Sequence, residues 1–415
     1  MDSPMTQLTA ESLWDLETLF AAPNFRWLET EKPIRALIYE GLPYAGHIAE
    51  VFAWYASPLT IGVAQEIPAG GFPAVVLIHG GGGTAFSTWV HLWAQRGYAA
   101  IAMDLGAMRP ADPEYDPVTG AFIKDVATDT EKRTPLGNGG PDQTAANKFA
   151  SIDREPEHHW TRHAVANTIL AHSLIRSFAE VDAEHTAVTG ISWGGYTTCI
   201  AASVDHRFKA AAPIYGCGFL HTGESNQKPE IYKLPQPSRA KWIALYDPSS
   251  HLPRCRVPIF FVNGTHDPHY PLDSYARTIA LPQGPVITRI EPHMLHSHEH
   301  GWAPMEIGIF IDTHCRPGSV PLPHLEQPEV GTDEIKVRYT STVPPKCAAL
   351  HFTAEKGLRA DRNWLSVAAV IESVFIVAPP LPAGTNTWFI TLTDERGAMV
   401  STAPMVSPPL RPEEN

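Results

Sequence analysis

A serine at position 192 has neighbours of the types that nucleophilic chemistry requires. It lies in HTAVTGISWGGYTTCIAA, residues 185–202, between Gly190 and Gly194 in the order G-x-S-x-G. Between a buried strand and a helix, this order is typical of a sharp turn that exposes the serine hydroxyl. A Cβ at either glycine would collide with the strand and helix that cross there. The amino terminus of the following helix would also stabilise negative charge beside Ser192.

An acid and a histidine follow the serine along the chain, in the order that such a turn requires. The apolar run 257–264 leads into THDPHYP, so Asp267 should lie just beyond the carboxyl end of a strand. The next loop, HMLHSHEHGW, supplies four imidazoles, those of His293, His296, His298 and His300. We expect His298 to take the proton of Ser192, with His296 as the alternative, while Asp267 orients the imidazole.

Both downstream segments also have simpler interpretations. Asp-Pro is common in turns, so Asp267 would then only cap one. The histidine-rich loop would suit a metal ion, but closely spaced imidazoles on a single loop make a poor site. We therefore expect neither a metal nor any other cofactor.

A glycine run, HGGGG at residues 79–83, ends the first long apolar stretch. Without side chains, its backbone N–H groups can approach a ligand closely. The N–H of Gly81, with that of Gly82 next, would form an oxyanion hole together with the N–H of Trp193. A phosphate cradle is the weaker interpretation, because GK[ST] is absent and no GxGxxG opens a helix here.

Several residues near these motifs are candidates for a substrate pocket. Those next to the expected strand ends are Trp193, Tyr215, Cys217 and Tyr270. Those in or near a long Pro- and Gly-rich segment are Arg109, Asp142 and Trp160. Each also has a simpler explanation, as a packed side chain or a solvated loop residue.

The elements needed to position these motifs are strands that alternate with helices. Residues 34–56 suggest two strands, and buried strands are expected at 74–83, 98–105, 185–191, 209–216, 257–264 and 284–291. Helices are expected at 88–97, at 159–181, directly after Ser192 and at 304–315. This alternation predicts the α/β class, with a mostly parallel central sheet and helices on both faces.

The pattern changes in the last quarter of the chain. We expect a catalytic domain over residues 1–318, with an insertion or lid at about 106–159, and a Pro-rich linker at 319–330. Short alternating segments with turns between them then predict a small all-β, Ig-like sandwich at residues 331–415.

Composition limits the partners and the compartment. The 415 residues carry a net charge of −13, which disfavours nucleic acids and anionic membranes, while a homo-oligomer stays open. The five cysteines lack CxxC spacing, so we expect buried free thiols. The acidic start MDSPMTQLTAESLWDLETLF does not resemble a signal peptide, and no membrane span is evident, so a cytoplasmic protein is expected.

Over about residues 40–315, the chain resembles α/β-hydrolases of the group that spans dienelactone hydrolases, acetyl xylan esterases and prolyl-oligopeptidase-like hydrolases. The resemblance is carried by VVLIHGGGG, AEVDAEHTAVTGISWGGY, VPIFFVNGTHDPHYPLDS and HMLHSHEHGW. It implies a triad of Ser192, Asp267 and His298. Ser297 stands where that group usually has glycine between two histidines, so the choice of histidine stays open.

The resemblance also implies an activity. A serine carboxylester hydrolase that removes acetyl or other short acyl groups from carbohydrates or similar small esters is expected. A prolyl-oligopeptidase-like serine peptidase is the alternative, and a binding or structural protein with a relic hydrolase core is a third. The resemblance does not extend to the C-terminal β segments.

Overall fold

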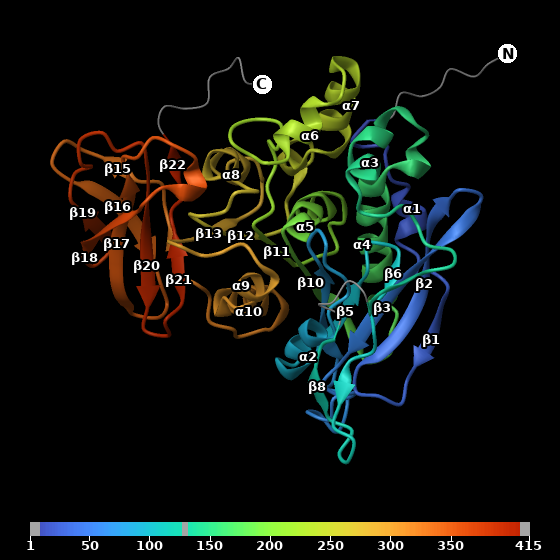
Figure 1. Ribbon diagram of the computed structural model, residues 1–415. Coiled ribbons are helices and arrows are strands. Elements are labelled where there is room, and N and C mark those ends of the chain that lie inside the picture. The colour runs from blue at the N-terminus through green and yellow to red at the C-terminus, as the bar shows by residue number, and fades with distance from the viewer. Residues whose placement is uncertain (1–8, 127–131, 407–415) are drawn as a thin grey trace.

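The computed structural model describes residues 9–126 and 132–406, and a long mixed sheet runs through it (Figure 1). In spatial order its first strands are β1 (Phe25–Glu29), β2 (Arg35–Tyr44), β3 (His47–Ala56), β5 (Ala99–Met103), β4 (Phe72–Ile78), β10 (Val181–Ile191), β11 (Ala210–Ile214), β12 (Ile259–Gly264) and β13 (Val286–Glu291). The pairings from β1 to β5 are antiparallel, and those from β5 to β13 are parallel. The predicted α/β class with a mostly parallel sheet is confirmed.

The parallel strands are apolar along their whole length because both of their faces are covered. Every residue of β5 and of β11 is buried. Helices α4 (Trp160–Arg176) and α5 (Trp193–Val204) pack together on one face, while α2 (Ser87–Gln95) and α10 (Met305–Cys315) pack on strands from the other face (Figure 1). The expected helices and strands of this part therefore all form, with ends shifted by a few residues.

The strand order brings the candidate motifs to one edge of the sheet. In the parallel pairing of β4 with β10, Ile78 lies opposite Gly190, so the glycine run and Ser192 begin side by side. In the pairing of β12 with β13, Gly264 lies opposite Glu291, so the loops that carry Asp267 and the histidines also start together. Parallel strands place all four carboxyl ends at this edge, where α/β folds bind their ligands.

The segment at 106–159 has only short elements. They are β6 (Met108–Arg109) paired with β9 (Thr134–Pro135), β7 (Glu114–Tyr115) paired with β8 (Phe122–Lys124), α3 (Ala145–Lys148), η2 (Ala150–Asp153) and η3 (Pro156–His158). Residues 127–131 of this predicted insertion lie outside the described residues. The remaining helices are α1 (Leu16–Leu19), α6 (Lys228–Tyr232), α7 (Gln236–Tyr246), η4 (Pro248–Ser250), η5 (Leu252–Arg254), α8 (Leu272–Ile279) and α9 (His298–Trp302).

The C-terminal region is rich in antiparallel strands, as expected. They are β14 (His324–Leu325), β15 (Glu329–Val330), β16 (Ile335–Thr340), β17 (Pro345–Thr353), β18 (Leu365–Ile371), β19 (Phe375–Ala378), β20 (Thr387–Asp394), β21 (Met399–Ser401) and β22 (Met405–Val406), with η6 (Arg359–Asp361) between β17 and β18. The expected linker at 319–330 contains β14 and β15, and both pair with β16, so this segment is part of the β-rich region. The last residues of the predicted sandwich, 407–415, lie outside the described residues.

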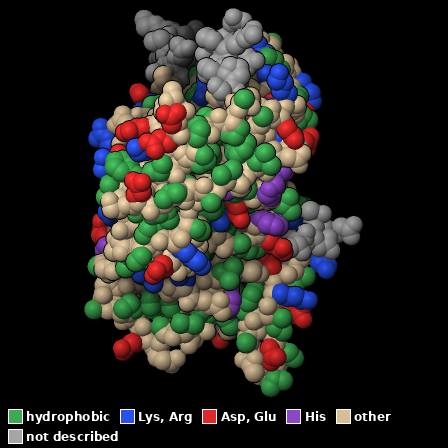
Figure 2. Space-filling view, turned by 90° about the vertical axis from the view of Figure 1, so that its left-hand side faces the viewer, with side chains coloured by type: hydrophobic (Ala, Val, Ile, Leu, Met, Phe, Trp, Pro, Cys, Tyr) green, Lys and Arg blue, Asp and Glu red, His purple; other side chains and the backbone are tan. Residues whose placement is uncertain are grey.

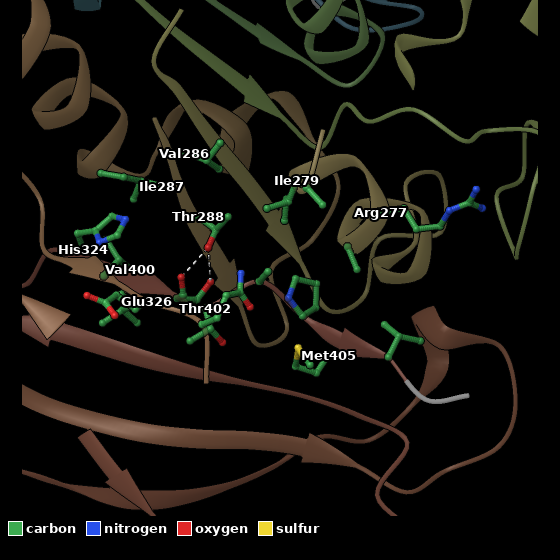
Figure 3. Close-up of a pocket in the computed structure, with 18 residues that line it drawn as sticks. Arg277, Ile279, Val286, Ile287, Thr288, His324, Glu326, Val400, Thr402 and Met405 are labelled. Carbon is green, nitrogen blue, oxygen red and sulfur yellow. Dashed lines mark hydrogen bonds between the residues drawn. The ribbon is translucent and has the colours of Figure 1, made fainter. Parts of the chain in front are cut away.

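The two parts of the chain share one sheet. Strand β21 pairs with β13 through Ser401 and Thr288, and the Ile290 N–H donates to Ser401 Oγ at 2.9 Å. The C-terminal strands therefore cover what would otherwise be an open edge at β13. Figure 3 shows a pocket at this junction, between α8 and β13 on one side and β14, β21 and β22 on the other.

The outer face of the C-terminal region has mixed character. Acidic and basic side chains are scattered among apolar ones in Figure 2. Four cysteines are buried free thiols, as expected, whereas Cys347 is exposed. Within the described ranges, none of the helices has both the length and the apolar character needed to cross a membrane.

Candidate active site

Ser192 occupies a strained corner between β10 and α5. Its φ of 60° and ψ of −117° are unusual for a residue with a side chain, and its N–H donates to Ile214 O at 2.9 Å. A Cβ at Gly190 would overlap the Gly194 carbonyl, and one at Gly194 would overlap the Ile78 carbonyl. The glycines are therefore required by the close crossing of β4, β10 and α5.

A continuous hydrogen-bond relay joins three distant segments at this corner. His296 Nε2 lies 2.9 Å from Ser192 Oγ, and His296 Nδ1 lies 2.8 Å from Asp267 Oδ2. The other carboxylate oxygen of Asp267 accepts from the N–H groups of His269 at 2.7 Å and Tyr270 at 3.0 Å. Asp267 is only 3% exposed, so three hydrogen bonds and a buried position fix its orientation and that of the imidazole.

The structure places His296, not His298, between Ser192 and Asp267, which corrects the favoured sequence assignment. His298 begins helix α9, behind the N-cap Ser297, whose side chain accepts from the His300 N–H at 3.0 Å. The start of the helix turns His298 toward the glycine run, where its Nε2 accepts from the Gly80 N–H at 3.0 Å. Burial lowers the pKa of His298 to about 3, so it stays a neutral acceptor there.

A capping signal in the sequence could have indicated this. Ser297 is a favourable N-cap, and the Glu two residues later favours a helix start. A helix that begins at 298 rotates its first side chain away from the preceding extended residue. The H-x-H pattern thus spans a loop and a helix, and its two histidines have different partners.

Tyr215 fixes the histidine loop from the interior. Its hydroxyl donates to Leu295 O at 2.9 Å, with Ser297 O at 3.3 Å, and its ring centroid lies 4.4 Å from that of His296. Tyr215 was expected on the rim of a substrate pocket, but it is fully buried. Cys217 and Tyr270 are buried too, but Tyr270 stays beside the site, since its ring centroid lies 6.1 Å from that of His296. Tyr215, at the end of β11, packs against the histidine loop and does not line an opening.

The glycine run lies against the indole that follows the serine. A Cβ built on Gly81 would lie 2.7 Å from Trp193 Cδ1, so only glycine allows this approach. Within the described residues, the N–H groups of Gly81 and Trp193 have no hydrogen-bond partner. Gly82 has a φ of +70°, and its carbonyl accepts from Arg133 at 2.8 Å. Unpaired N–H groups on the glycine run and on the residue that follows Ser192 suit an oxyanion.

The buried imidazole of His79 ties the glycine run to the loop after β5, a role that the sequence did not predict. Its Nε2 accepts from the Leu105 N–H at 2.9 Å, and its Nδ1–H donates to Gly80 O at 2.8 Å. Burial lowers the pKa of His79 to about 4, which keeps it neutral and fixes which nitrogen carries the proton. With His298, two neutral imidazoles thus hold the N–H and the carbonyl oxygen of Gly80.

The other pocket candidates lie in different surroundings. Arg109 pairs with Asp112 at 3.1 Å on the surface, and Asp142 accepts from the Thr144 N–H and the Asn147 amide. Trp160 is buried, and its indole N–H donates to Leu105 O at 2.8 Å. Trp193, also largely buried, packs against the rings of Phe149, Trp160 and Tyr196.

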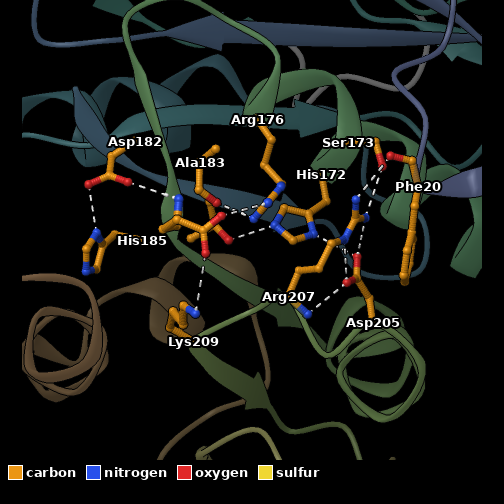
Figure 4. A network of polar contacts seen from close by, with 12 residues as sticks. Phe20, His172, Ser173, Arg176, Asp182, Ala183, His185, Asp205, Arg207 and Lys209 are labelled. Atoms are coloured by element: carbon orange, nitrogen blue, oxygen red, sulfur yellow. Dashed lines mark hydrogen bonds and ion pairs between the residues drawn. The ribbon is translucent and has the colours of Figure 1, made fainter. Parts of the chain in front are cut away.

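A second histidine–aspartate pair serves as a structural contrast (Figure 4). His172 Nδ1 lies 2.7 Å from Asp205 Oδ2, and its Nε2 lies 2.7 Å from Thr186 Oγ1. Arg207 also pairs with Asp205, and the imidazole is fully buried against Phe208. A hydroxyl without access to solvent cannot attack a substrate, so this network ties α4 to β10 and to the end of α5.

Two family models match the chain. The one described as acetyl xylan esterase (AXE1) matches residues 10–222, just over half of the 415 residues. The one described as the prolyl oligopeptidase family matches residues 154–306, a range that includes Ser192, Asp267 and His296. No curated protein sequence matches the chain.

Solved structures share the fold at low sequence identity. Acetyl xylan esterase from Paenibacillus sp. R4 is 19% identical, with a TM-score of 0.56 over 76% of this chain and 96% of its own. Acetyl xylan esterase 1 from Thermoanaerobacterium sp. JW/SL YS485 is 15% identical, with a TM-score of 0.50 over 75% of this chain and 99% of its own. These similarities establish the α/β-hydrolase fold that the sequence motifs predicted.

Proposed function

Since the chain belongs to the acetyl xylan esterase (AXE1) family, and is thus a serine carboxylic ester hydrolase of the α/β-hydrolase type, we propose that Ser192, His296 and Asp267 are its catalytic triad. We propose further that it removes acetyl or other short acyl groups from carbohydrates or similar small esters. The observation that supports the triad most directly is the position of His296, within hydrogen-bond distance of both the hydroxyl and the carboxylate.

The proposed reaction has two halves. Ser192 Oγ attacks the ester carbonyl while His296 Nε2 takes its proton, and Asp267 stabilises the imidazolium that forms. The carbonyl oxygen becomes an oxyanion that the N–H groups of Gly81 and Trp193 receive. When the tetrahedral intermediate collapses, His296 returns the proton to the leaving alcohol, and the acyl group stays on Ser192. Water then attacks the acyl-enzyme by the same route and releases the acid.

The proposed substrates, short acyl esters of sugars, are inferred from family membership. Two solved structures with this fold are named acetyl xylan esterases, and the family model carries the same description. The indole of Trp193 lies against Gly81 and packs on the buried rings of Phe149 and Trp160, so the substrate class is proposed from the family and not from an exposed aromatic face.

A serine variant tests the proposal. Ser192→Ala should lower turnover of p-nitrophenyl acetate and of acetylated xylo-oligosaccharides by about 10⁴–10⁶-fold, because the covalent route is lost. Ser203→Ala is a matched control, since Ser203 lies on the same helix and donates to the backbone of Cys199. Ser192→Ala with most of its activity left would refute the proposed nucleophile.

A peptidase activity is the second candidate, and the match to the prolyl oligopeptidase family over residues 154–306 favours it. The same residues would then act on an amide. Comparing p-nitrophenyl acetate with p-nitroacetanilide separates the two, because only the leaving group differs. We expect a strong preference for the ester. A comparable kcat/KM on the anilide would favour the peptidase.

A further inference from the structure

One cation lies next to the proposed oxyanion hole without an anionic partner. Lys148, the last residue of α3 in the insertion, places its Nζ 4.4 Å from the ring centroid of Trp193 and 5.1 Å from that of Trp160. A Cβ built on Gly81 would lie 3.7 Å from the same nitrogen. The ammonium therefore lies close to Gly81, whose N–H belongs to the proposed oxyanion hole.

The packing around Lys148 fixes this position. Its carbonyl accepts from the Trp242 indole N–H at 2.7 Å. The neighbouring Phe149 is buried, with its ring centroid 5.1 Å from that of Trp242 and 5.9 Å from that of Trp193. The backbone at the end of α3 is thus held by aromatic contacts close to Trp193.

The charge of Lys148 is not neutralised in the part of the chain that the structure describes. Among these residues its Nζ forms neither an ion pair nor a hydrogen bond. The acid that acts on it is Asp142, whose Oδ1 already accepts from the Thr144 N–H and the Asn147 amide. Burial lowers the pKa of Lys148 to about 8, so the group is still mostly protonated near neutral pH.

An unpaired, partly desolvated ammonium is favourable only where an anion arrives to pair with it. Two aromatic rings lie beside the Lys148 ammonium, the residue is only partly exposed, and Gly81 of the proposed oxyanion hole lies next to it. Resting on the proposed ester hydrolysis at Ser192, we propose that Lys148 is a specificity-determining residue that binds a carboxylate on the substrate, so that the preferred substrates are acidic esters such as acylated uronic-acid sugars.

Matched esters test this without knowing the natural substrate. The neutral ester is p-nitrophenyl acetate, and the acidic one is mono-p-nitrophenyl succinate, which carries a carboxylate on the acyl part. A second pair, phenyl acetate and 3-acetoxybenzoate, places the carboxylate on the leaving group instead. The readout is the ratio of kcat/KM between the acidic and the neutral member of each pair, so effects common to both esters cancel.

Three variants give the expected pattern. Lys148→Met should lower the acidic-to-neutral ratio by about tenfold or more for at least one pair, because a charge-assisted contact is lost. Lys148→Arg should keep most of the ratio, since it retains the charge. Lys124→Met, which removes an exposed cation paired with Glu114 in the same insertion, should leave the ratio unchanged.

Ionic strength and pH supply readouts that a merely structural role would not move. Salt should reduce the ratio in the wild type and not in Lys148→Met. The ratio should also fall above about pH 8 in the wild type, as Lys148 loses its proton, and not in Lys148→Arg. The titratable groups coupled to Lys148 are Asp142 and His79, which is neutral over this range, and Arg133, on the carbonyl of Gly82, also acts on His79.

The outcomes distinguish this inference from the function on which it rests. An equal loss on both members of each pair, or no loss in Lys148→Met, would overturn the carboxylate site while ester hydrolysis stands. If Ser192→Ala retained activity on all four esters, the proposed function itself would fail. If Lys148→Met does not fold, the salt and pH dependence of the ratio in the wild type and Lys148→Arg still decides.

Discussion

The ring of Tyr215 lies 4.4 Å from that of His296, and the Tyr215 hydroxyl donates to the carbonyl that precedes the histidine. The φ of Tyr215 is +63°, so this residue is held in a strained conformation where the chain leaves β11. A buried residue on one strand end thus fixes a loop from another strand end. The imidazole is oriented by its neighbours and does not depend on a substrate to be aligned.

Removing the Tyr215 hydroxyl should therefore lower kcat by more than any loss of folding stability would explain. We expect Tyr215→Phe to lower kcat by about tenfold with a small change in KM, because the aromatic contact remains and only the loop anchor is lost. Tyr39→Phe is the matched control, since its hydroxyl donates to Asn167 O at 2.8 Å, away from the site, and its activity should be retained. Equal kcat values in the two variants would contradict this role of Tyr215.

The two histidines should respond very differently to substitution. His296→Gln should lower kcat by about 10⁴-fold or more, because the base is lost. His298→Gln should cost about tenfold, because only the anchor of the Gly80 N–H is changed. Steady-state kinetics on p-nitrophenyl acetate measure both. A larger loss in His298→Gln would restore the assignment made from sequence.

Buried histidines should make the protein sensitive to acid. Burial lowers the pKa to about 3 or 4, from an ordinary value of 6.5, in His79, His159, His163, His172, His251, His298 and His351. Below pH 6.5 these histidines bind protons in the unfolded chain but stay neutral in the folded chain. The stabilisation is thus complete above that pH and is lost progressively as the pH falls toward 4.

Urea unfolding at a series of pH values between about 7 and 5 measures this slope, each such histidine adding up to about 1.4 kcal/mol per pH unit. His351→Gln should make the slope shallower, because His351 lies between Ser366 and Thr391 in the C-terminal strands and takes no part in the site. A free energy of unfolding that stays constant over this range would show that folding does not lower the pKa of these imidazoles.

An ion pair between the two parts of the chain should contribute to stability. Arg359, from η6, lies 3.5 Å from the carboxylate of Asp273 on α8, which is buried and whose pKa is raised mainly by that burial. Arg359→Met should lower the free energy of unfolding by about 3 kcal/mol, since an unpaired buried carboxylate remains. Arg338→Met is the control, because its contact with Glu326 is 3.9 Å long and exposed, and its loss should be below about 1 kcal/mol. A similar loss in both variants would contradict the importance of this pair.

Much of the architecture followed from local patterns. Apolar runs such as those of β4, β5 and β11 are recognisable because a strand covered on both faces has no polar positions. Ser192 and Asp267 were recognisable because each follows such a run directly. The helices α6 and α7 were not foreseen, since their apolar pattern is weak and interrupted by prolines.

The sequence by itself determined the α/β class, the strained corner at Ser192 and the need for glycine beside it, because these depend on residue size and order within a few positions. Only the tertiary structure decided that His296 faces the serine, that Tyr215 is an internal anchor and that Lys148 reaches the glycine run. Each of these depends on the direction in which a side chain leaves its loop. That direction is set by packing between segments tens of residues apart, and no local pattern specifies it.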